Sequence, residues 1–339
     1  MNPYFHRNGR DRAFYREHLA PRLPKRILDA HVHVNLPEHV AMVPEERWRS
    51  DWALEAGHLL PVPDAYDCAR ELFPDADYFI NAFPWPIREA DLRANNGYLA
   101  AMQAEGRISA LMCVKPDWDP EEVERTLLDG GFRGFKPYPD MVSGSKGADM
   151  SIFDFMPGAQ WDILEKHGKA IMLHLPRKGR LSDDDNVREL KEIRDAYPSV
   201  TIIIAHFGRS FCPCFLREGI DKLGNADGFY FDSSAVTNPE VYDIAFGELS
   251  SERIIFGTDM PITFWHGKQA CEGRTYANVT SEDYSWNTNR RPPEEEALYT
   301  IFIYEEARAV LDALERNGLG TDIKERVFDL NARRALKIE

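Results

Sequence analysis

Long hydrophobic runs are absent from this chain of 339 residues, and no stretch reaches the roughly 20 apolar residues of a membrane-spanning helix. A basic cluster is also absent, because 41 Lys and Arg residues stand against 56 Asp and Glu residues, giving a formal net charge of −15. Nucleic acids and anionic membranes bind clustered Lys and Arg, so we expect neither as a partner. Residues 1–25 are polar and charged, and they lack the apolar centre of a secretory signal.

Cysteine is scarce, and its count is odd. The five cysteines are Cys68, Cys113, Cys212, Cys214 and Cys271. Without an export signal, this usage predicts reduced thiols in a cytoplasmic protein. The Cys-Pro-Cys stretch at 212–214 supplies only two of the four ligands that a structural zinc site needs, so we interpret these residues as loop or core thiols.

What the sequence does contain is a series of eight short apolar runs, each ending at Pro, Gly or a polar residue. The runs cover 26–34, 77–84, 108–116, 132–139, 169–176, 200–208, 228–235 and 253–261. Runs of this length and composition predict β-strands, and nearly continuous apolar runs predict strands buried on both faces.

Helical patterns lie between most of these runs, for example at 119–131, 158–168 and 185–198. Strands that alternate with helices predict a parallel sheet, and eight such units predict an α/β fold of the TIM (β/α)₈ barrel type. We expect one domain over 1–339.

The residues in excess of a minimal barrel fall in three segments of the sequence. Residues 1–25 form an N-terminal extension, a long segment follows strand 1 at 35–75, and another follows strand 8 at 262–296. We expect a distorted barrel with long loops after strands 1 and 8. Loops of such length within a compact domain are usually functional, so 262–296 is predicted to be a lid over the active site.

Titratable side chains stand at the ends of several predicted strands. They are His31 and His33 on strand 1, Lys136 on strand 4, His174 on strand 5, His206 on strand 6 and Asp259 on strand 8. The C-terminal ends of barrel strands surround one active-site mouth. Side chains two apart on a strand share a face, which places both strand-1 histidines there. We therefore expect the whole set to converge.

This set of residue types suits a divalent metal. Neutral imidazoles and carboxylates are ligands for zinc and similar ions, and a bound divalent ion makes water a nucleophile at neutral pH. A further histidine can serve as general acid or base, because its ordinary pKa lies near neutrality.

The ordered motifs resemble those of the amidohydrolase superfamily. They are ILDAHVHV, GFRGFKPYP, AIMLHLP, IIIAHFG, IIFGTDMP and VFDLNARRAL, which together cover about residues 27–336. Within that superfamily the chain looks most like the amidohydrolase-related branch that includes aminocarboxymuconate-semialdehyde decarboxylase.

The resemblance implies a distorted TIM barrel with a metal at its mouth. It implies His31, His33, His174 and Asp259 as metal ligands, with His206 as catalytic acid or base and Asp259 sharing the proton transfer. It implies one divalent ion, with zinc expected first and manganese as the alternative.

Three interpretations of Lys136 remain open: a carbamylated bridge to a second metal, a cation facing substrate, or a structural ion pair. The cations Arg177 and Arg209 follow His174 and His206, and with Lys136 and Tyr138 they are predicted to bind a substrate that carries a carboxylate.

The leading hypothesis is a metal-dependent hydrolase that acts on a small, carboxylate-bearing amide or lactone by means of metal-activated water. The alternative is a metal-dependent, non-oxidative decarboxylase of an unsaturated or aromatic acid, which a basic carboxylate clamp in a hydrophobic pocket would favour. A metal-free lactonase is a third interpretation, against which the complete ligand set argues. The expected partner is a small-molecule substrate, and barrels of this branch suggest a homodimer.

Overall fold

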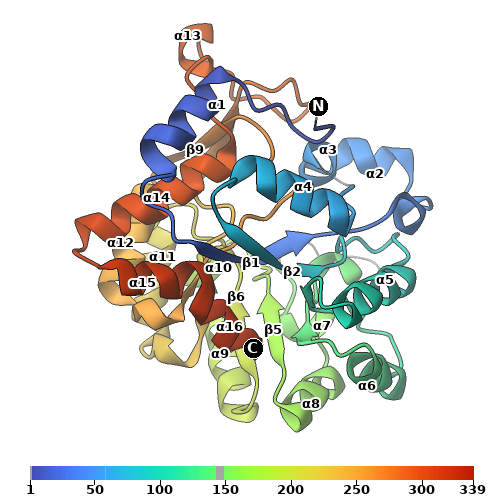
Figure 1. Cartoon of the computed structure of the whole chain (residues 1–339). Coiled ribbons are helices and arrows are strands. Elements are labelled where there is room, and N and C mark those ends of the chain that lie inside the picture. The colour runs from blue at the N-terminus through green and yellow to red at the C-terminus, as the bar shows by residue number, and fades with distance from the viewer. Residues whose placement is uncertain (1, 58, 143–148) are drawn as a thin grey trace.

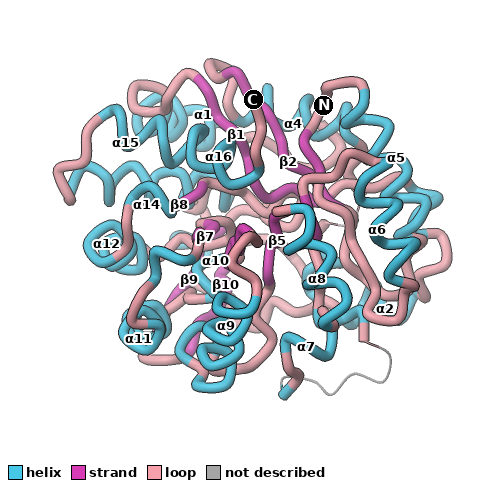
Figure 2. The backbone as a smooth tube through the Cα atoms, turned by 90° about the horizontal axis from the view of Figure 1, so that it is seen from below, coloured by secondary structure: helices cyan, strands magenta, loops and turns pink. Residues whose placement is uncertain are grey.

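Each of the eight apolar runs forms a parallel strand at the centre of the molecule (Figure 2). In this computed structural model, residues 2–57, 59–142 and 149–339 are described. The barrel strands are β1 (Arg26–His33), β2 (Asp77–Phe83), β3 (Ser109–Ala110), β4 (Gly134–Phe135), β5 (Ala170–Leu173), β6 (Thr201–Ile204), β7 (Tyr230–Asp232) and β8 (Ile254–Ile255).

The strands pair in chain order around a ring. One sheet has the order β1-β2-β3 and another the order β4-β5-β6-β7-β8. Two parallel bridges join these sheets, between Met112 and Phe135 and between Val32 and Met260. The predicted TIM barrel is therefore confirmed.

Helices surround the strands on the outside of the ring (Figures 1 and 2). The helices that follow the strands are α4 (Val62–Leu72), α5 (Leu92–Ala104), α6 (Pro120–Asp129), α8 (Gly158–His167), α9 (Asp184–Ala196), α11 (Pro213–Leu223), α12 (Pro239–Glu248) and α14 (Phe302–Arg316). The three helices expected from sequence are α6, α8 and α9. Asp183 caps α9 by accepting from two backbone amides, and α8 ends at Gly168, whose φ of 54° suits glycine.

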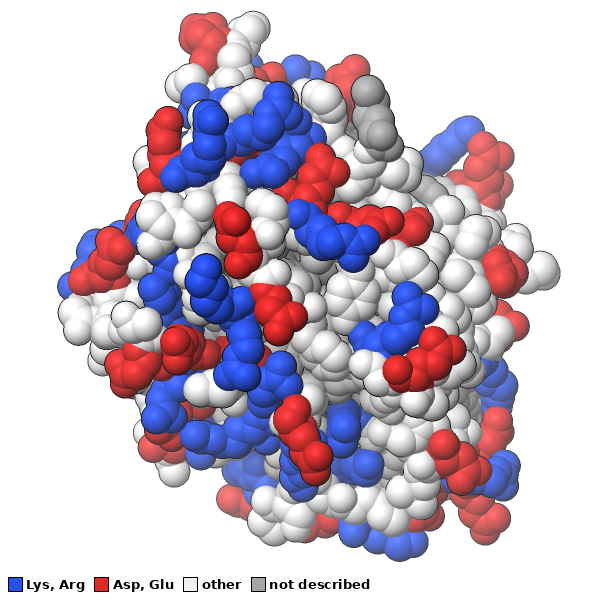
Figure 3. Space-filling view, viewed as in Figure 1, with Lys and Arg blue, Asp and Glu red and all other residues white. Residues whose placement is uncertain are grey.

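The chain closes with short helices against the N-terminal ends of the strands. These are α15 (Thr321–Glu325) and α16 (Asn331–Leu336). A separate short helix in the middle of the chain, α7 (Ile152–Phe155), precedes α8. Asn331 donates from its amide to the carbonyl oxygens of Ser251 and Ile254 at 2.8 Å each, which fixes α16 to the start of β8. On the face shown in Figure 3, acidic and basic side chains lie interspersed. Within the described residues, no helix is long and apolar enough to cross a membrane.

The extra segments contain structure of their own. The segment after β1 holds α2 (Glu45–Ser50) and α3 (Trp52–Ala56), and the N-terminal extension holds α1 (Gly9–Phe14). The segment expected as a loop at 262–296 contains the antiparallel hairpin of β9 (Gly267–Glu272) and β10 (Thr275–Thr280), followed by α13 (Pro293–Glu296). This departs from the loop expectation, because Gly273, with a φ of 59°, lets the chain reverse and pair.

A disulfide links this hairpin to the barrel. Cys271 on β9 is bonded to Cys212, which directly precedes α11. The expectation of reduced thiols is wrong for these two residues, because the hairpin folds back against the start of α11 and brings together cysteines 59 residues apart. Cys68 and Cys113 are buried free thiols, and Cys214 is a partly exposed one.

His266 joins the N-terminal extension to the segment after β8. Its Nε2 lies 2.9 Å from Asp11 Oδ2, and its Nδ1 lies 3.0 Å from Glu282 Oε1. Burial lowers the pKa of His266, but the hydrogen bonds to the two carboxylates outweigh burial and raise this pKa to about 9. The protonated ring can donate to both carboxylates at once.

We expect this contact to make stability depend on pH. Because the folded-state pKa is raised from 6.5 to about 9, the stabilisation is complete below pH 6.5 and is lost as the pH rises through about 9. The difference in unfolding free energy between wild type and His266→Gln should shrink by about 3 kcal/mol across that window. Urea unfolding of both proteins at several pH values measures this difference, and a constant difference would refute the role of His266.

Candidate active site

A cavity of about 310 Å³ opens at the C-terminal ends of the barrel strands. Eight of the nine predicted site residues line it: His31, His33, Lys136, Tyr138, His174, His206, Arg209 and Asp259. Aromatic side chains form much of the remaining wall, namely Trp52, Trp85, Phe211, Trp265, Tyr276 and Phe302. The lining also includes side chains from both long insertions, so the segment predicted as a lid contributes directly to the cavity wall.

Three predicted metal ligands meet in this cavity. The Nε2 atoms of His31 and His33 lie 3.2 Å and 3.1 Å from Oδ1 of Asp259. The backbone brings them together, because Asp259 donates its amide to the carbonyl oxygen of His31 at 2.9 Å. Asp259 holds an unusual φ of 59°, which turns its side chain toward β1.

These spacings fit a bound divalent ion. Ligand atoms about 2.0–2.1 Å from a tetrahedral zinc are about 3.3 Å apart, which is close to the separations seen here. Nε2 of His31 and Oδ1 of Asp259 are buried and have no hydrogen-bond partner among the described residues. Leaving buried polar atoms unsatisfied is costly, and a shared cation would satisfy both.

His174 lies in the same cavity but outside this trio. Its ring centroid is 5.4 Å from that of His206 and 4.6 Å from that of Tyr138, and its Nδ1 is buried without a hydrogen-bond partner among the described residues. Among the described residues, two groups could hold a metal: His31, His33 and Asp259, and His31, His206 and Asp232. The role of His174 as a ligand therefore stays a prediction.

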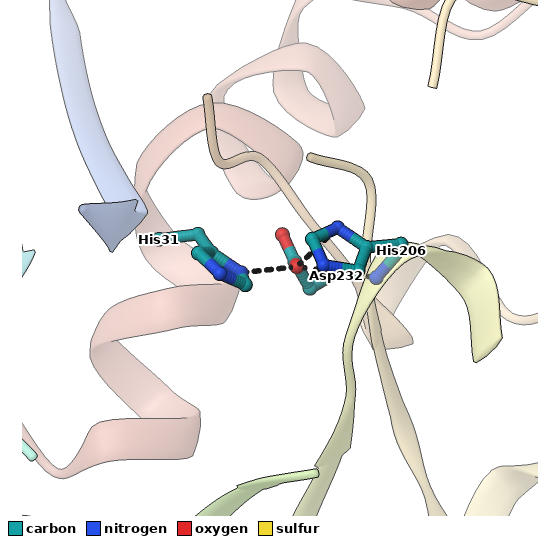
Figure 4. A group of neighbouring side chains, drawn as sticks. All are labelled: His31, His206 and Asp232. Carbon is teal, nitrogen blue, oxygen red and sulfur yellow. Dashed lines mark hydrogen bonds and ion pairs between the residues drawn. The ribbon is translucent and has the colours of Figure 1, made fainter. Parts of the chain in front are cut away.

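Asp232 is a site residue that the sequence reasoning missed. It ends β7, and its carboxylate lies between His31 and His206 (Figure 4). Oδ2 lies 2.7 Å from Nδ1 of His31, and it accepts from the backbone amide of His206 at 3.3 Å. The signal was present, since the polar stretch Asp232–Ser233–Ser234 interrupts an apolar strand where the barrel mouth begins.

The hydrogen bonds determine which nitrogen of each ring carries a proton. Nδ1 of His31 faces the carboxylate of Asp232. Burial raises the pKa of this carboxylate, but the charge and hydrogen bond of His31 outweigh burial and lower the pKa to about 2, so Asp232 is ionised. Nδ1 of His206 lies 2.9 Å from the carbonyl oxygen of Ser234, which can only accept. Both rings therefore donate through Nδ1 and keep Nε2 for a ligand or a proton.

We expect Asp232→Asn to weaken binding of Zn²⁺ or Mn²⁺ by about 10–100-fold, because the charge that orients His31 is removed. Titration against a competing chelator measures this affinity. Asp29→Asn is the matched control, since Asp29 is equally buried and accepts from the backbone amide of His31, but its other bonds go to Thr258 and Tyr78 and none goes to an imidazole ring. Equal metal affinity in Asp232→Asn and wild type would contradict the orienting role.

Burial sets the protonation states of most other groups in the site. It lowers the pKa of His33 and of His206 to about 4, and it lowers the pKa of His174 well below the ordinary value. The nearby histidines outweigh burial at Asp259 and hold its pKa well below the ordinary value. Neutral imidazoles and an ionised carboxylate are the forms that bind metals. His31 differs, because Asp232 outweighs burial and raises its pKa.

The segment that carries His206 has a left-handed backbone. In α10 (His206–Arg209), the φ values are 56° for His206, 48° for Phe207, 67° for Gly208 and 64° for Arg209. Non-glycine residues pay about 1–2 kcal/mol each for this conformation. Such strain persists where surrounding contacts impose it and is concentrated at functional sites.

Lys136 is a buried amine in the cavity wall, 1% exposed. Its Nζ has no hydrogen-bond partner among the described residues, and it lies 5.2 Å from the centroid of the Phe83 ring and 5.8 Å from that of Tyr138. Burial lowers the pKa of Lys136 to about 8. Within the described part of the chain it forms no ion pair, so the structural-ion-pair interpretation loses its support.

Arg177 requires a correction, since it does not line the cavity. Its guanidinium bonds to the Glu189 carboxylate in two places, at 2.7 Å and 3.0 Å, and to Asn186 Oδ1 at 2.9 Å. The loop after β5 turns toward α9, so this cation stabilises a helix contact, and the cavity lining gives no support to its predicted role in substrate binding. Arg209 does line the cavity.

Residues 28–338 match the family described as amidohydrolase. The chain belongs to the amidohydrolase family. A dihydroorotase of Synechococcus sp. (strain CC9902) is 26% identical over 121 residues, which are 33% of this amidohydrolase and 32% of the dihydroorotase. The chain therefore matches about a third of that curated relative.

Solved structures extend the likeness to the whole fold of this amidohydrolase. A 2,6-dihydroxybenzoate decarboxylase from Rhizobium is 17% identical with a TM-score of 0.56, and the match covers 93% of this chain and 99% of that one. A probable 2-pyrone-4,6-dicarboxylic acid hydrolase from Acinetobacter baumannii is 15% identical with a TM-score of 0.55, covering 92% and 99%. An amidohydrolase from Burkholderia multivorans with bound zinc is 12% identical with a TM-score of 0.60, covering 92% and 99%. The fold is thus shared by hydrolases and decarboxylases.

Proposed function

We propose that this amidohydrolase is a metal-dependent hydrolase of a small amide or lactone that carries a carboxylate. One observation carries the proposal: the Nδ1–H of His206 is bound to the carbonyl oxygen of Ser234, which leaves Nε2 as an acceptor in the cavity. A fixed acceptor beside the His31–Asp259 pair is the general base that hydrolysis needs.

His31, His33 and Asp259 would hold the divalent ion, with His174 as the proposed fourth ligand. When bound, the ion polarises the scissile carbonyl and makes water more acidic. Zinc is the ion we propose first, because this set of nitrogens and one carboxylate is typical of zinc sites, and manganese is the alternative.

The chain's own residues would complete the reaction. His206 accepts the proton of the attacking water at Nε2 and returns it to the leaving nitrogen or oxygen, with Asp259 as a second acceptor. Asp232 and Ser234 hold the two rings in position for these transfers. Lys136 and Arg209 bind the substrate carboxylate, and the aromatic walls exclude bulk water.

Non-oxidative decarboxylation of an unsaturated or aromatic acid is the second candidate. The observation that favours it is the combination of two cations, Lys136 and Arg209, with an aromatic-lined cavity. His33 itself packs against the rings of Phe83 and Trp85, with centroids 4.8 Å and 4.7 Å apart. An apolar site of this kind would desolvate a substrate carboxylate.

A single assay separates the two candidates. Protein loaded with Zn²⁺ or Mn²⁺ is incubated with carboxylated lactones and amides and with unsaturated acids, in water labelled with heavy oxygen. Hydrolysis adds the oxygen of one labelled water to the organic product, whereas decarboxylation releases carbon dioxide and leaves the organic product without label. His206→Asn should lower the hydrolytic rate by about 10²–10⁴-fold while the metal content is retained. Carbon dioxide release alone would establish the second candidate.

A further inference from the structure

Two arginines connect the loop after β5 to the turn after β6. Arg209 extends from the turn, and its Nη1 donates to the carbonyl oxygens of Leu175 at 3.1 Å and Pro176 at 3.0 Å. In the opposite direction, Nη1 of Arg180 donates to the carbonyl oxygen of Arg209 at 2.9 Å. Each guanidinium therefore holds the backbone of the other segment.

These two segments carry two of the site histidines. His174 directly precedes the loop after β5, and His206 begins the left-handed turn after β6. The turn has short-range backbone hydrogen bonds of its own: the amides of Gly208 and Arg209 donate to Ala205 at 2.8 Å and 3.3 Å, that of Ser210 donates to His206 at 3.1 Å and that of Phe211 donates to Arg209 at 3.0 Å. A strained turn of this kind depends on outside contacts to keep its conformation.

Arg180 has no carboxylate partner within residues 2–57, 59–142 and 149–339. It is only partly exposed, and burial lowers its pKa. Its guanidinium carbon lies 4.5 Å from the ring centroid of Tyr276, 4.7 Å from that of Phe215 and 5.2 Å from that of Phe211. Tyr276 and Phe211 line the cavity, and their ring centroids are 4.6 Å apart.

Placing a cation in a half-buried position without a carboxylate partner costs hydration free energy. An apolar side chain would fill the same space without this cost. The planar guanidinium does something that an apolar side chain cannot. It donates to the carbonyl oxygen of a strained turn while its faces pack against the rings of the cavity wall.

We propose that Arg180 is a positioning residue that, together with Arg209, forms a reciprocal brace fixing His206 relative to His174 and to the Phe211–Tyr276 wall. The kinetic consequence rests on the proposed function, because it assumes that His206 transfers protons. The structural consequence, a more stable backbone around His206, does not rest on the proposed function, and it is measured without a substrate.

The experiment compares metal-loaded wild type with Arg180→Met and Arg180→Lys. Arg274→Met is the matched control, because Arg274 also packs over Phe215, at 4.6 Å, and also reaches the loop after β5 through Ser182 at 2.9 Å, but it pairs with Glu218 and does not contact the turn. Amide hydrogen exchange over residues 205–211 should become about tenfold faster in Arg180→Met, less so in Arg180→Lys, and stay unchanged in Arg274→Met. Unchanged exchange in both Arg180 variants would overturn the brace.

Kinetics on whichever substrate class the assay above identifies provides the second measurement. Arg180→Met should lower kcat about tenfold with KM unchanged, because His206 loses its orientation while the carboxylate contacts remain. Equal losses of kcat in Arg180→Met and Arg274→Met would show that Arg180 contributes only packing, which would overturn the proposal. If wild type turns over no substrate, the proposed function fails, and the exchange result alone still decides the brace.

Discussion

Asp259→Asn is expected to lower kcat/KM by on the order of 10³-fold and to reduce the bound metal well below one ion per chain. Asparagine keeps the shape of the side chain but removes the negative charge between His31 and His33. Asp259 is 6% exposed and is held ionised by its histidine neighbours, so solvent cannot replace the lost charge. Elemental analysis of the purified proteins measures the metal content, and initial rates measure kcat/KM.

His33→Ala should lose the metal in parallel, because it removes a second member of the same trio. Asp51→Asn is the control within the same cavity: its carboxylate pairs with Arg47 and caps α3, away from the trio. About two ions per wild-type chain would favour a carbamylated Lys136. Full metal retention in both trio variants would refute this ligand set, and a wild type without metal after supplementation would favour a metal-free lactonase.

The barrel was predictable because its signal is local. Eight apolar runs separated by helical patterns specify the strands, and a run such as Thr201–Ile204 is buried on both faces. The convergence of His31, His33 and Asp259 followed from the same logic, since the C-terminal ends of parallel strands meet at one mouth. Neither step needed knowledge of side-chain orientation in the loops.

The errors arose where tertiary contacts decide the outcome. Arg177 follows His174 as closely as Arg209 follows His206, yet the guanidinium of Arg177 forms an ion pair with Glu189 on α9. Spacing along the chain cannot reveal that a carboxylate from another element will bind this guanidinium. Asp232 was missed for the converse reason, because its role depends on a neighbour 201 residues away.

Backbone conformation was equally hidden from the sequence. His206, Arg209 and Asp259 all have positive φ, which only a few per cent of non-glycine residues adopt, even though Asp and His adopt it more often than most types. Periodicity predicts where a strand ends but carries no information about a left-handed turn beyond that end. The conformation of this turn is accompanied by contacts from other segments, such as the bond from Arg180 to the carbonyl oxygen of Arg209, which only the folded structure reveals.

Removing the Cys212–Cys271 link is expected to lower the unfolding free energy by about 4 kcal/mol, the chain-entropy value for a loop of this length. The crosslink closes a segment whose ends are 59 residues apart, so it restricts a large part of the unfolded chain. It also fixes β9 beside the start of α11, and Gln269 on β9 lines the cavity. Cys271→Ser, and mild reduction of wild type, should both lower Tm.

Thiol titration in denaturant tests the link directly, because the described cysteines include three free thiols, Cys68, Cys113 and Cys214. Three reactive thiols before reduction and five after it are expected. Cys214→Ser is the control, since it removes a neighbouring thiol without breaking the crosslink, and its Tm should match that of wild type. Five reactive thiols in the unreduced protein would show that the crosslink is absent, and Cys271→Ser should then unfold at the wild-type Tm. In that case noncovalent contacts would hold the hairpin over the cavity, among them the Phe211–Tyr276 contact and the hydrogen bonds that Gln269 donates to Thr237 and Ala235.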